Sequence, residues 1–472
     1  MTRSWVFTAC LAMAAAPAVA ADKPLPLGDW LTLSGWTAAR LAEVGADWPP
    51  TPEVRRDLAD LAERFRRLPD RLLNEATRPP DDPAVVIRPG DVVALRGEVV
   101  TATRGDAATA EVLLQPETAA AGVRVTTLAA PAAWLAADAE PSGQPAEARG
   151  LVVAWNDDLR LVVTPRIRWT PTTADGGTVN YGEALLGTAG FDVGLLDDLA
   201  DGRPLGAAEA APFYGCLSAI QSYRPRQLLR AAGENLPRYA ARWAEVATAG
   251  GAKQRLAALT VQRAEEGHYS VAPLFNDAVN QRGQLMAFEG VARRAVRIDL
   301  SLDRNGLPSR VPERYGLDHY YEVEVFPPDS QNLPLVFCVL ELPTGFPVGD
   351  SIQEPVRVAG FFLKRWAYRT RKPGGEAGAD DLRQLAPLLV GSGPVWLPTP
   401  QPSRGSLGQL WAGAAFVAVL LAIAFALRRQ SFADEQFERS TLARLKAAAA
   451  EADASPPTGE SGPGAGGSSG TD

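Results

Sequence analysis

The feature that most constrains this chain is an internal repeat. Gly90 and Gly97 bracket an apolar run with the same spacing as Gly283 and Gly290, and both runs continue as strand-like, arginine-bearing segments. Four later landmarks follow in the same order in both halves: a Glu-Val-x-x-x-Pro motif, a proline closing an apolar run, a glycine opening one, and a Trp-x-Pro-Thr motif. They are 111–116, Pro131, Gly150 and 169–172 in the first copy, and 322–327, Pro343, Gly360 and 396–399 in the second. These landmarks predict a duplicated module.

Each copy, from about 87 to 172 and from about 281 to 399, contains about five short runs rich in Val, Leu, Phe and Tyr. Glycine, proline and aspartate turns separate the runs, which is typical of a small antiparallel barrel or sandwich. Glycines within the first run suit a strand that bends to close a barrel. The second copy differs by an insertion at 371–384.

A five-stranded count with a bent first strand resembles the OB-fold, and the run 355–364 resembles the strand by which such modules close. The resemblance implies a recognition role. The predicted fold class is therefore α+β, with two duplicated small antiparallel β-barrel (OB-like) modules separated by a helical region, plus one C-terminal transmembrane helix.

The first 20 residues have the pattern of a secretion signal. Arg3 precedes an apolar run from 5 to 16, and Ala18-Val19-Ala20 supplies the small-x-small motif that a signal peptidase needs. The alternative, an uncleaved anchor, is less favoured because the run is short for a bilayer span of roughly 20 residues. We expect cleavage near Ala20 or Ala21.

The C-terminal segment 410–427 is almost wholly apolar and predicts a transmembrane helix. Arg428 and Arg429 follow it directly, so the positive-inside bias leaves the C-terminal tail in the cytoplasm and the large N-terminal part outside. The abundance of Ala, Gly, Pro and Arg is typical of a high-GC bacterial gene, which indicates the cytoplasmic membrane of a bacterium.

Small residues recur every four positions along this segment and would let a partner helix approach closely. The general richness of the chain in alanine is the competing explanation. The residues are Ala414, Ala418, Ala422 and Ala426.

The predicted organisation is a signal peptide (1–20), an N-terminal helical region (21–80), the first module (81–172), a helical insert (173–280), the second module (281–399), a tether (400–409), the transmembrane helix (410–427) and a cytoplasmic tail (428–472), disordered from about 453. In the N-terminal region Thr51 caps a helix with Pro52 in its first turn. Its apolar stripe is Val54, Leu58, Leu61, Phe65 and Leu68. In the insert, Pro212, Pro225 and Pro237 are expected to cut the helical pattern into pieces.

Composition argues against several kinds of chemistry. The chain has two histidines, His268 and His319, and lacks HExxH, Cys-x-x-Cys and Gly-x-Ser-x-Gly motifs, so we expect neither a metal site nor a cofactor. A net charge of -8 makes nucleic acid an unlikely partner. After signal removal Cys216 and Cys338 remain, either paired or as two separate buried thiols.

Two acidic clusters invite the interpretation of a site. Asp197, Asp198 and Asp201 lie together, and the segment 303–306 contains fragments of a calcium loop without its later glutamate. Solvated turns explain both more simply.

The strongest surface candidate is the segment 361–372, which interleaves cations and aromatics. The candidate binding residues are Lys364, Arg365, Trp366, Tyr368 and Arg369. Strand alternation places Lys364, Trp366 and Tyr368 on one face, as a ligand-gripping strand would require. The alternative is that the aromatics pack into the barrel while the cations are solvated or pair with Glu322 and Glu324.

The favoured function is a non-enzymatic, membrane-anchored binding or scaffold protein whose β modules meet an envelope protein or a glycan. An enzyme acting on envelope polymers through dispersed carboxylates is the alternative. A binder of single-stranded nucleic acid is the third and least favoured hypothesis.

Overall fold

The computed structural model describes residues 26–46, 48–80, 85–106, 108–117, 121–175, 178–303, 305–369, 383–397, 413–425, 443–444 and 446. The chain divides into two compact units, Met1–Pro398 and Thr399–Asp472, and each is described by itself. The predicted signal peptide, the predicted tether and nearly all of the predicted tail lie outside the described residues.

The first β module is a closed ring of five strands, in the order β2-β3-β4-β6-β5 with β5 pairing back to β2. Every pair is antiparallel except β4 with β6. The strands are β2 (Val92–Arg104), β3 (Ala110–Pro116), β4 (Val123–Ala129), β5 (Pro145–Trp155) and β6 (Arg160–Trp169), with the short β1 (Thr77–Arg78) parallel to β2.

The second module repeats this arrangement. Its ring is β7-β8-β9-β11-β10, β10 pairs back to β7, and the parallel pair is β9 with β11. The strands are β7 (Leu285–Asp299), β8 (His319–Phe326), β9 (Leu335–Val339), β10 (Glu354–Arg369), β11 (Arg383–Gly391) and β12 (Pro394–Trp396). The short helices η1 (Ala132–Trp134), α10 (Val311–Tyr315) and η6 (Pro328–Ser330) connect strands within the two modules. The OB-like, barrel-forming resemblance is confirmed.

The repeat extends to the register of the first strand. Gly97 lies opposite Pro116 on the next strand, and Gly290 lies against Phe326 and Pro327. The register then shifts between Val99 and Thr101 in β2, and between Ala292 and Arg294 in β7. The bulge therefore falls at the same distance after each glycine, which gives both first strands the bend that the sequence predicted.

The closing strands match as well. Gly150 lies opposite Val93, and Gly360 lies opposite Met286, each four residues before the glycine of its first strand. At the far end, Trp169 pairs with Ala146 and Trp396 pairs with Val356. Because every one of these residues was a landmark or lies opposite one, the correspondence predicted from the sequence is confirmed at the level of register.

Four helices precede the first barrel: α1 (Leu27–Leu33), α2 (Ala38–Ala46), α3 (Pro52–Phe65) and α4 (Asp70–Ala76). As predicted, the Thr51 hydroxyl accepts the N–H of Val54, and Pro52 opens α3. The stripe of α3 packs with Val92, Leu151, Leu161 and Val163 of the barrel in one buried cluster. These helices therefore cover one face of the first module.

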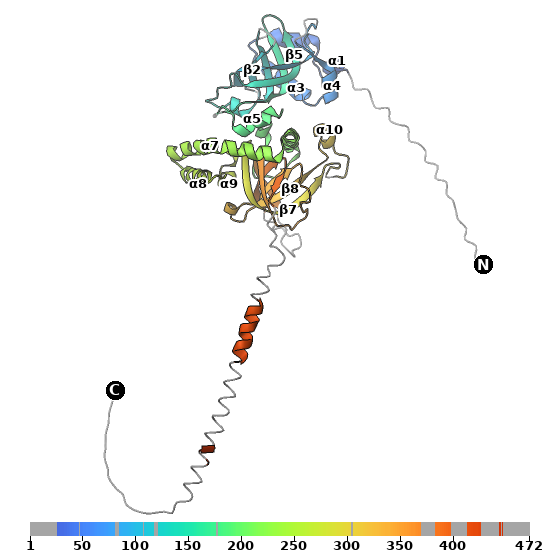
Figure 1. Cartoon of the computed structure of the whole chain (residues 1–472). Coiled ribbons are helices and arrows are strands. Elements are labelled where there is room, and N and C mark those ends of the chain that lie inside the picture. Colours follow the sequence, from blue (N-terminus) through green and yellow to red (C-terminus); the bar gives the residue numbers. More distant parts are fainter. Residues whose placement is uncertain are drawn as a thin grey trace, which may run out of the picture. The chain divides into compact units, whose positions relative to one another are not determined.

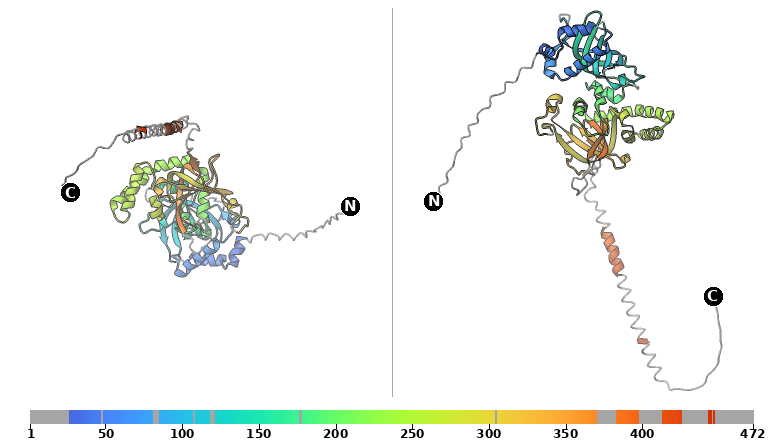
Figure 2. Two further views of the ribbon diagram at one scale, coloured as in Figure 1. Left: turned by 90° about the horizontal axis from the view of Figure 1, so that it is seen from below. Right: turned by 180° about the vertical axis from the view of Figure 1, so that it is seen from behind.

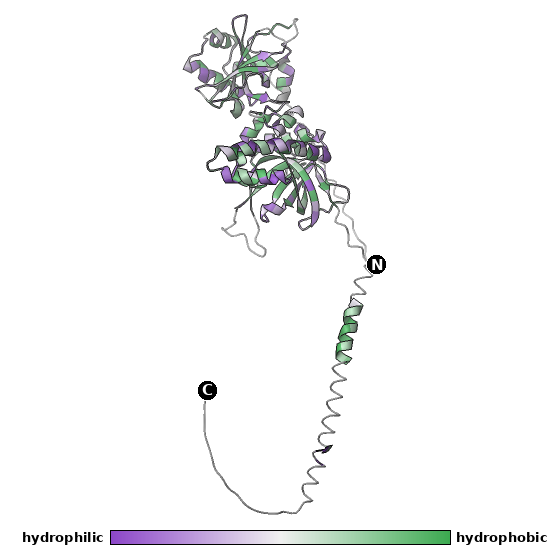
Figure 3. Ribbon diagram, turned by 60° about the vertical axis from the view of Figure 1, so that its left-hand side comes forward, coloured by the Kyte–Doolittle hydropathy of each residue, from purple (hydrophilic) through white to green (hydrophobic). Residues whose placement is uncertain are grey.

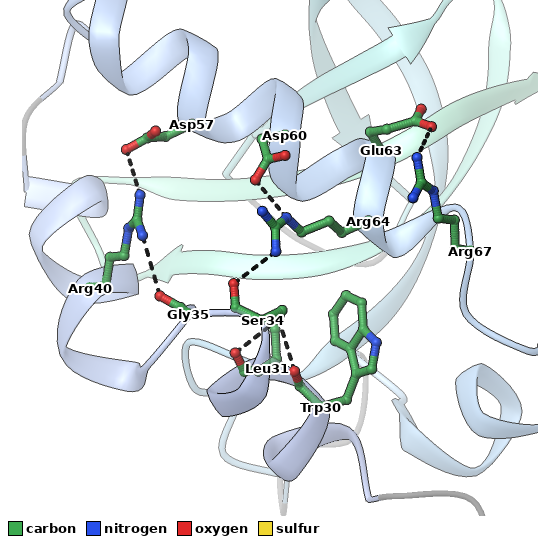
Figure 4. Close-up of polar contacts among 10 residues, drawn as sticks. All are labelled: Trp30, Leu31, Ser34, Gly35, Arg40, Asp57, Asp60, Glu63, Arg64 and Arg67. Carbon is green, nitrogen blue, oxygen red and sulfur yellow. Dashed lines mark hydrogen bonds and ion pairs between the residues drawn. The ribbon is translucent and has the colours of Figure 1, made fainter.

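Polar contacts join the N-terminal helices to one another (Figure 4). Arg40 on α2 donates to Asp57 on α3, at 3.1 Å, and to the carbonyl of Gly35. Arg64 bonds to Asp60 within α3 and to the Ser34 carbonyl after α1. These contacts are exposed and contribute little to stability, most of which comes from the buried stripe of α3.

The insert between the modules is helical, as predicted, and its core is continuous with that of both barrels. Its elements are α5 (Tyr181–Thr188), η2 (Val193–Asp198), η3 (Ala207–Glu209), α6 (Ala210–Ala219), η4 (Ile220–Ser222), α7 (Pro225–Ala249), α8 (Gln254–Glu265), α9 (Ala272–Asn276) and η5 (Ala278–Gln281). The helices α7 and α8 lie side by side in Figures 1 and 2.

One proline prediction is wrong. Pro225 begins α7, but α7 runs through Pro237 without ending. Pro237 and Gly233, one turn earlier, are both exposed. Water can therefore satisfy the Gly233 carbonyl that loses its helical partner, while the buried face of α7 keeps its packing.

In the second unit, residues 413–425 form a helix whose side chains are exposed. Figure 3 colours it hydrophobic along nearly its whole length. Phe416, Leu421 and Phe425 are among its exposed apolar residues. Of the alanines that recur every four residues, Ala426 lies outside the described part. Within that part, none of the helices is long and apolar enough to cross a membrane.

The close strand approach at Gly97 generates a stability prediction. A Cβ there would lie 2.0 Å from the Gln115 carbonyl oxygen, a backbone atom that cannot move aside. We expect Gly97→Ala to lower the free energy of unfolding by about 3 kcal/mol, measured by urea denaturation. The control is Gly233→Ala on α7, which meets no atom within 4 Å and should raise it by about 0.5–1 kcal/mol. Equal effects of the two changes would contradict the close-approach explanation.

Candidate functional site

The predicted cationic strand is an internal connection rather than an open surface. Lys364 on β10 is fully buried, and its Nζ lies 2.5 Å from Oε1 of Glu209 at the end of η3. Glu209 also accepts the backbone N–H groups of Ala200 and Gly206. Desolvation opposes ionisation, but these hydrogen bonds and the Lys364 charge hold the pKa of Glu209 below its usual value.

Arg365, the next residue, makes a second connection to the insert. Its Nε and Nη2 donate to Oδ2 of Asp201 at 2.9 and 2.6 Å, and its backbone N–H donates to Oδ1. Its Nη1 donates to the carbonyl of Phe275 at 2.8 Å. All three guanidinium nitrogens thus donate to internal partners, and the Arg365 hydrogen bonds keep the pKa of Asp201 low against the opposing effect of desolvation.

The aromatic residues of the strand are half-buried. Trp366 and Tyr368 pack against the main core with ring centroids 5.8 Å apart, and the Tyr368 hydroxyl donates to Gln384. For Arg369 the structure describes the backbone alone, paired with Arg383. Lys364, Trp366 and Tyr368 keep the alternate positions that the sequence predicted, because the pairing of β10 with β11 is regular from Lys364 onward. Lys364 is fully buried, however, so the three side chains form no open face.

The expected pairing of these cations with Glu322 and Glu324 is also wrong. Both glutamates on β8 lie within ion-pair distance of Arg294 on the adjacent strand β7, at 3.6 and 3.4 Å. Arg294 reaches them across the strand pair, whereas Lys364 and Arg365 face the insert.

The acidic cluster 197–201 belongs to the same connection, so its interpretation as a solvated turn is incomplete. Asp197 accepts the N–H of Ala132, and Asp198 pairs with Arg166, both in the first module. Asp201 binds the second module through Arg365. We call residues 192–209, together with Arg166, Arg282, Lys364 and Arg365, the joint. The turn 303–306, by contrast, is a local one in which Asp303 accepts the N–H groups of Asn305 and Leu307.

Two further groups complete the joint. Arg282 donates to the carbonyls of Leu196 and Leu199, the latter at 2.6 Å. Asp192 accepts the N–H of Trp169 at 2.9 Å, and desolvation raises the pKa of Asp192 to about 6 although that hydrogen bond opposes the shift. The joint therefore ties the last strand of the first module to the insert as well.

The first module has an open groove that is lined by several arginines. It has a volume of about 980 Å³ and lies where β1, β2, β5 and β6 meet. Its charged and aromatic lining residues are Arg78, Arg96, Arg149, Arg160, Glu117 and Trp155. Four cations face one carboxylate, in a chain that is acidic as a whole. An excess of guanidinium groups of this kind favours an anionic ligand.

Contacts with neighbouring residues position two of the arginines that line the groove. Arg149 donates to the Thr77 hydroxyl from Nε at 3.1 Å and from Nη2 at 2.9 Å, which links β5 to β1. Arg160 lies over the Trp155 ring, 5.5 Å from its centroid, and the two residues face each other across the β5–β6 hairpin. The Asn156 carboxamide accepts two N–H groups of the hairpin turn. Sequence reasoning missed this groove because its residues come from four separate strands and form no motif.

The cysteines and histidines offer no further site. Cys216 and Cys338 are both buried and both free, which resolves the alternatives in favour of separate thiols, and burial raises the pKa of each. His319 lies 2.5 Å from Asp318 at an exposed position. Across the described ranges, histidine, cysteine and acidic side chains form no group of three that could hold a metal ion.

Comparison with known proteins adds no relative: no family model, no curated protein and no solved structure matches this chain.

The buried ion pair of the joint generates a testable expectation. Lys364→Met leaves the Glu209 charge uncompensated and should lower the free energy of unfolding by about 3–5 kcal/mol. The double variant Lys364→Met/Glu209→Gln should recover part of that loss. Arg357→Met is the matched control on the same strand, because its pair with Glu289 is exposed and should contribute less than about 1 kcal/mol. A strictly additive double variant, measured by chemical denaturation, would argue against a coupled pair.

A second expectation concerns pH. Glu183 forms the capping box with Asn180 at the start of α5. Desolvation raises the pKa of Glu183 to about 8, and this effect outweighs the opposing effects of the hydrogen bond from the Asn180 N–H and of the Arg242 charge. The folded state therefore keeps the Glu183 proton to a higher pH than the unfolded state does. The associated stability is present below about pH 4.5 and is lost as pH rises through about 8.

Glutamine keeps the capping box and carries no charge. The thermal unfolding temperature of Glu183→Gln should therefore rise relative to that of the wild type as pH increases from 5 to 8. Glu245→Gln, at an exposed position on α7, should show no such trend. A constant difference between Glu183→Gln and wild type over this range would exclude a raised pKa.

Proposed function

We propose that this chain is a non-enzymatic binding or scaffold protein, anchored in the cytoplasmic membrane of a bacterium, with its two β modules outside the cytoplasm. The observation that carries the proposal is the arginine-lined groove, an open surface of the first module with four arginines and one carboxylate in its lining. An envelope protein or a glycan is the proposed partner.

The anchoring part of the proposal draws support from residues 413–425. An isolated helix that exposes Phe416, Leu420 and Phe425 to water is unfavourable, and burial of those side chains in lipid removes the penalty. The proposed span is 410–427, Arg428 and Arg429 favour a cytoplasmic tail, and 1–20 would be the secretion signal. Ala414, Ala418 and Ala422 lie on this helix and would accept a partner helix.

The alternatives have less support. A hydrolase needs two acids facing one cleft, whereas Asp198, Asp201 and Glu209 are each bound to a cation of the joint. A nucleic-acid binder conflicts with the net charge of -8.

The anchor is tested by fractionation of cells that express the full chain. Replacement of 410–427 by a polar linker of equal length should release the protein from carbonate-washed membranes. A matched variant carrying an unrelated apolar segment of leucine and alanine should stay in the membrane fraction, since only hydrophobicity and length matter for a span. Unchanged membrane association of the polar variant would refute the anchor.

A further inference from the structure

The two barrels use equivalent outer positions for different purposes. Their registers match, so Trp155 corresponds to Arg365 and Arg160 to Pro387, since each pair faces across the same hairpin position. In the second module Arg365 binds the insert through Asp201. In the first module Trp155 lines the groove. A position occupied by the protein's own chain in one copy is therefore open in the other.

The first strands show the same contrast. Ala287 and Glu289 of β7, which correspond to Ala94 and Arg96 of β2, line a pocket together with residues of α7. Only a pocket of about 280 Å³ remains there, lined by α7 residues such as Leu229 and Gly233. On the first module the equivalent strand face opens into the groove of about 980 Å³.

The charges of the groove are suited to an external anion. Arg96 is paired with Glu147, at 2.9 Å, and Arg149 is held by Thr77. Among the described residues, Arg78 and Arg160 form no ion pair with a carboxylate. Arg78 is exposed and Arg160 is half-buried against Trp155. Two guanidinium groups are thus presented on a fixed frame, and a planar fork of this kind matches a carboxylate in two-point contact.

We propose that this groove binds a short acidic oligosaccharide, with its uronate carboxylates on Arg78 and Arg160 and a sugar ring against Trp155. The proposal rests on the proposed function, which places the groove outside the cytoplasm where such glycans occur. The half-buried indole supplies an apolar face for the C–H side of a sugar ring.

A glycan fits the groove better than a single-stranded nucleic acid does. Sequence-independent strand binding uses a basic track and successive aromatic platforms. Here Trp155 is the one aromatic residue among those that line the groove, so the lining offers a single platform rather than a series. Outside the groove the charge of the chain is strongly negative, which opposes a long, uniformly charged polymer.

The test uses the full chain in a non-ionic detergent and isothermal titration calorimetry. The probes are a hexamer of galacturonic acid, a neutral glucose hexamer and a thymidine hexanucleotide. The galacturonate hexamer should bind, with an affinity that falls as salt rises, and the glucose hexamer should bind much more weakly. Arg160→Gln and Arg78→Gln should each weaken binding about tenfold, as expected for loss of one charged hydrogen-bonding partner.

Arg357→Gln is the matched control, because it removes an exposed arginine from the pocket at the equivalent face of the second module. It should leave affinity unchanged, and Trp155→Leu should weaken binding without changing its salt dependence. Circular dichroism and thermal unfolding establish that each variant is folded.

Equal or tighter binding of the thymidine hexanucleotide through the same arginines would overturn the proposal in favour of nucleic acid. Absence of galacturonate binding by the folded wild type, or binding that survives both arginine changes, would overturn it outright. None of these outcomes bears on membrane anchoring, which the fractionation experiment decides separately.

Discussion

The buried pair of Lys364 and Glu209 is the interaction on which the attachment of the helical insert to the second module depends. Two charges are withdrawn from water, and such a pair is stable only when geometry and additional hydrogen bonds compensate for desolvation. Glu209 meets that condition with two backbone N–H groups besides the ammonium. Because β10 pairs with β7, β11 and β12, the strand that closes the second barrel is also the strand that fixes the insert. A single strand therefore both closes the barrel and attaches the insert.

The first barrel is secured at the equivalent position by packing instead of charge. Ala154 corresponds to Lys364, and it contacts Gly45 of α2 so closely that a Cβ on that glycine would lie 2.9 Å from the alanine methyl group. One copy is thus covered by a flat helix face and the other by a buried ion pair. The open groove lies on the first module, where Arg78 and Arg160 form no ion pair with a described carboxylate.

Patterns within short stretches of sequence predicted well. Gly97, Gly290 and the Trp-x-Pro-Thr motifs located the repeat, because the glycines meet a backbone and the tryptophans pair at fixed register. The role of Lys364 could not be predicted, because its partner Glu209 lies 155 residues away in sequence, on the insert. The groove was hidden for a related reason: Arg78 and Arg160 become neighbours only when the barrel closes.

The matched registers make the molecule a comparison within itself. Equivalent positions in the two modules share the strand register but differ in their surroundings, as Trp155 and Arg365 do. A substitution tolerated in one copy and damaging in the other therefore reports the surroundings alone, since strand geometry is common to both. Because of the duplication, each module serves as the reference for the other. Equivalent strand positions can be compared where the second barrel is covered by the insert and the first is open to solvent.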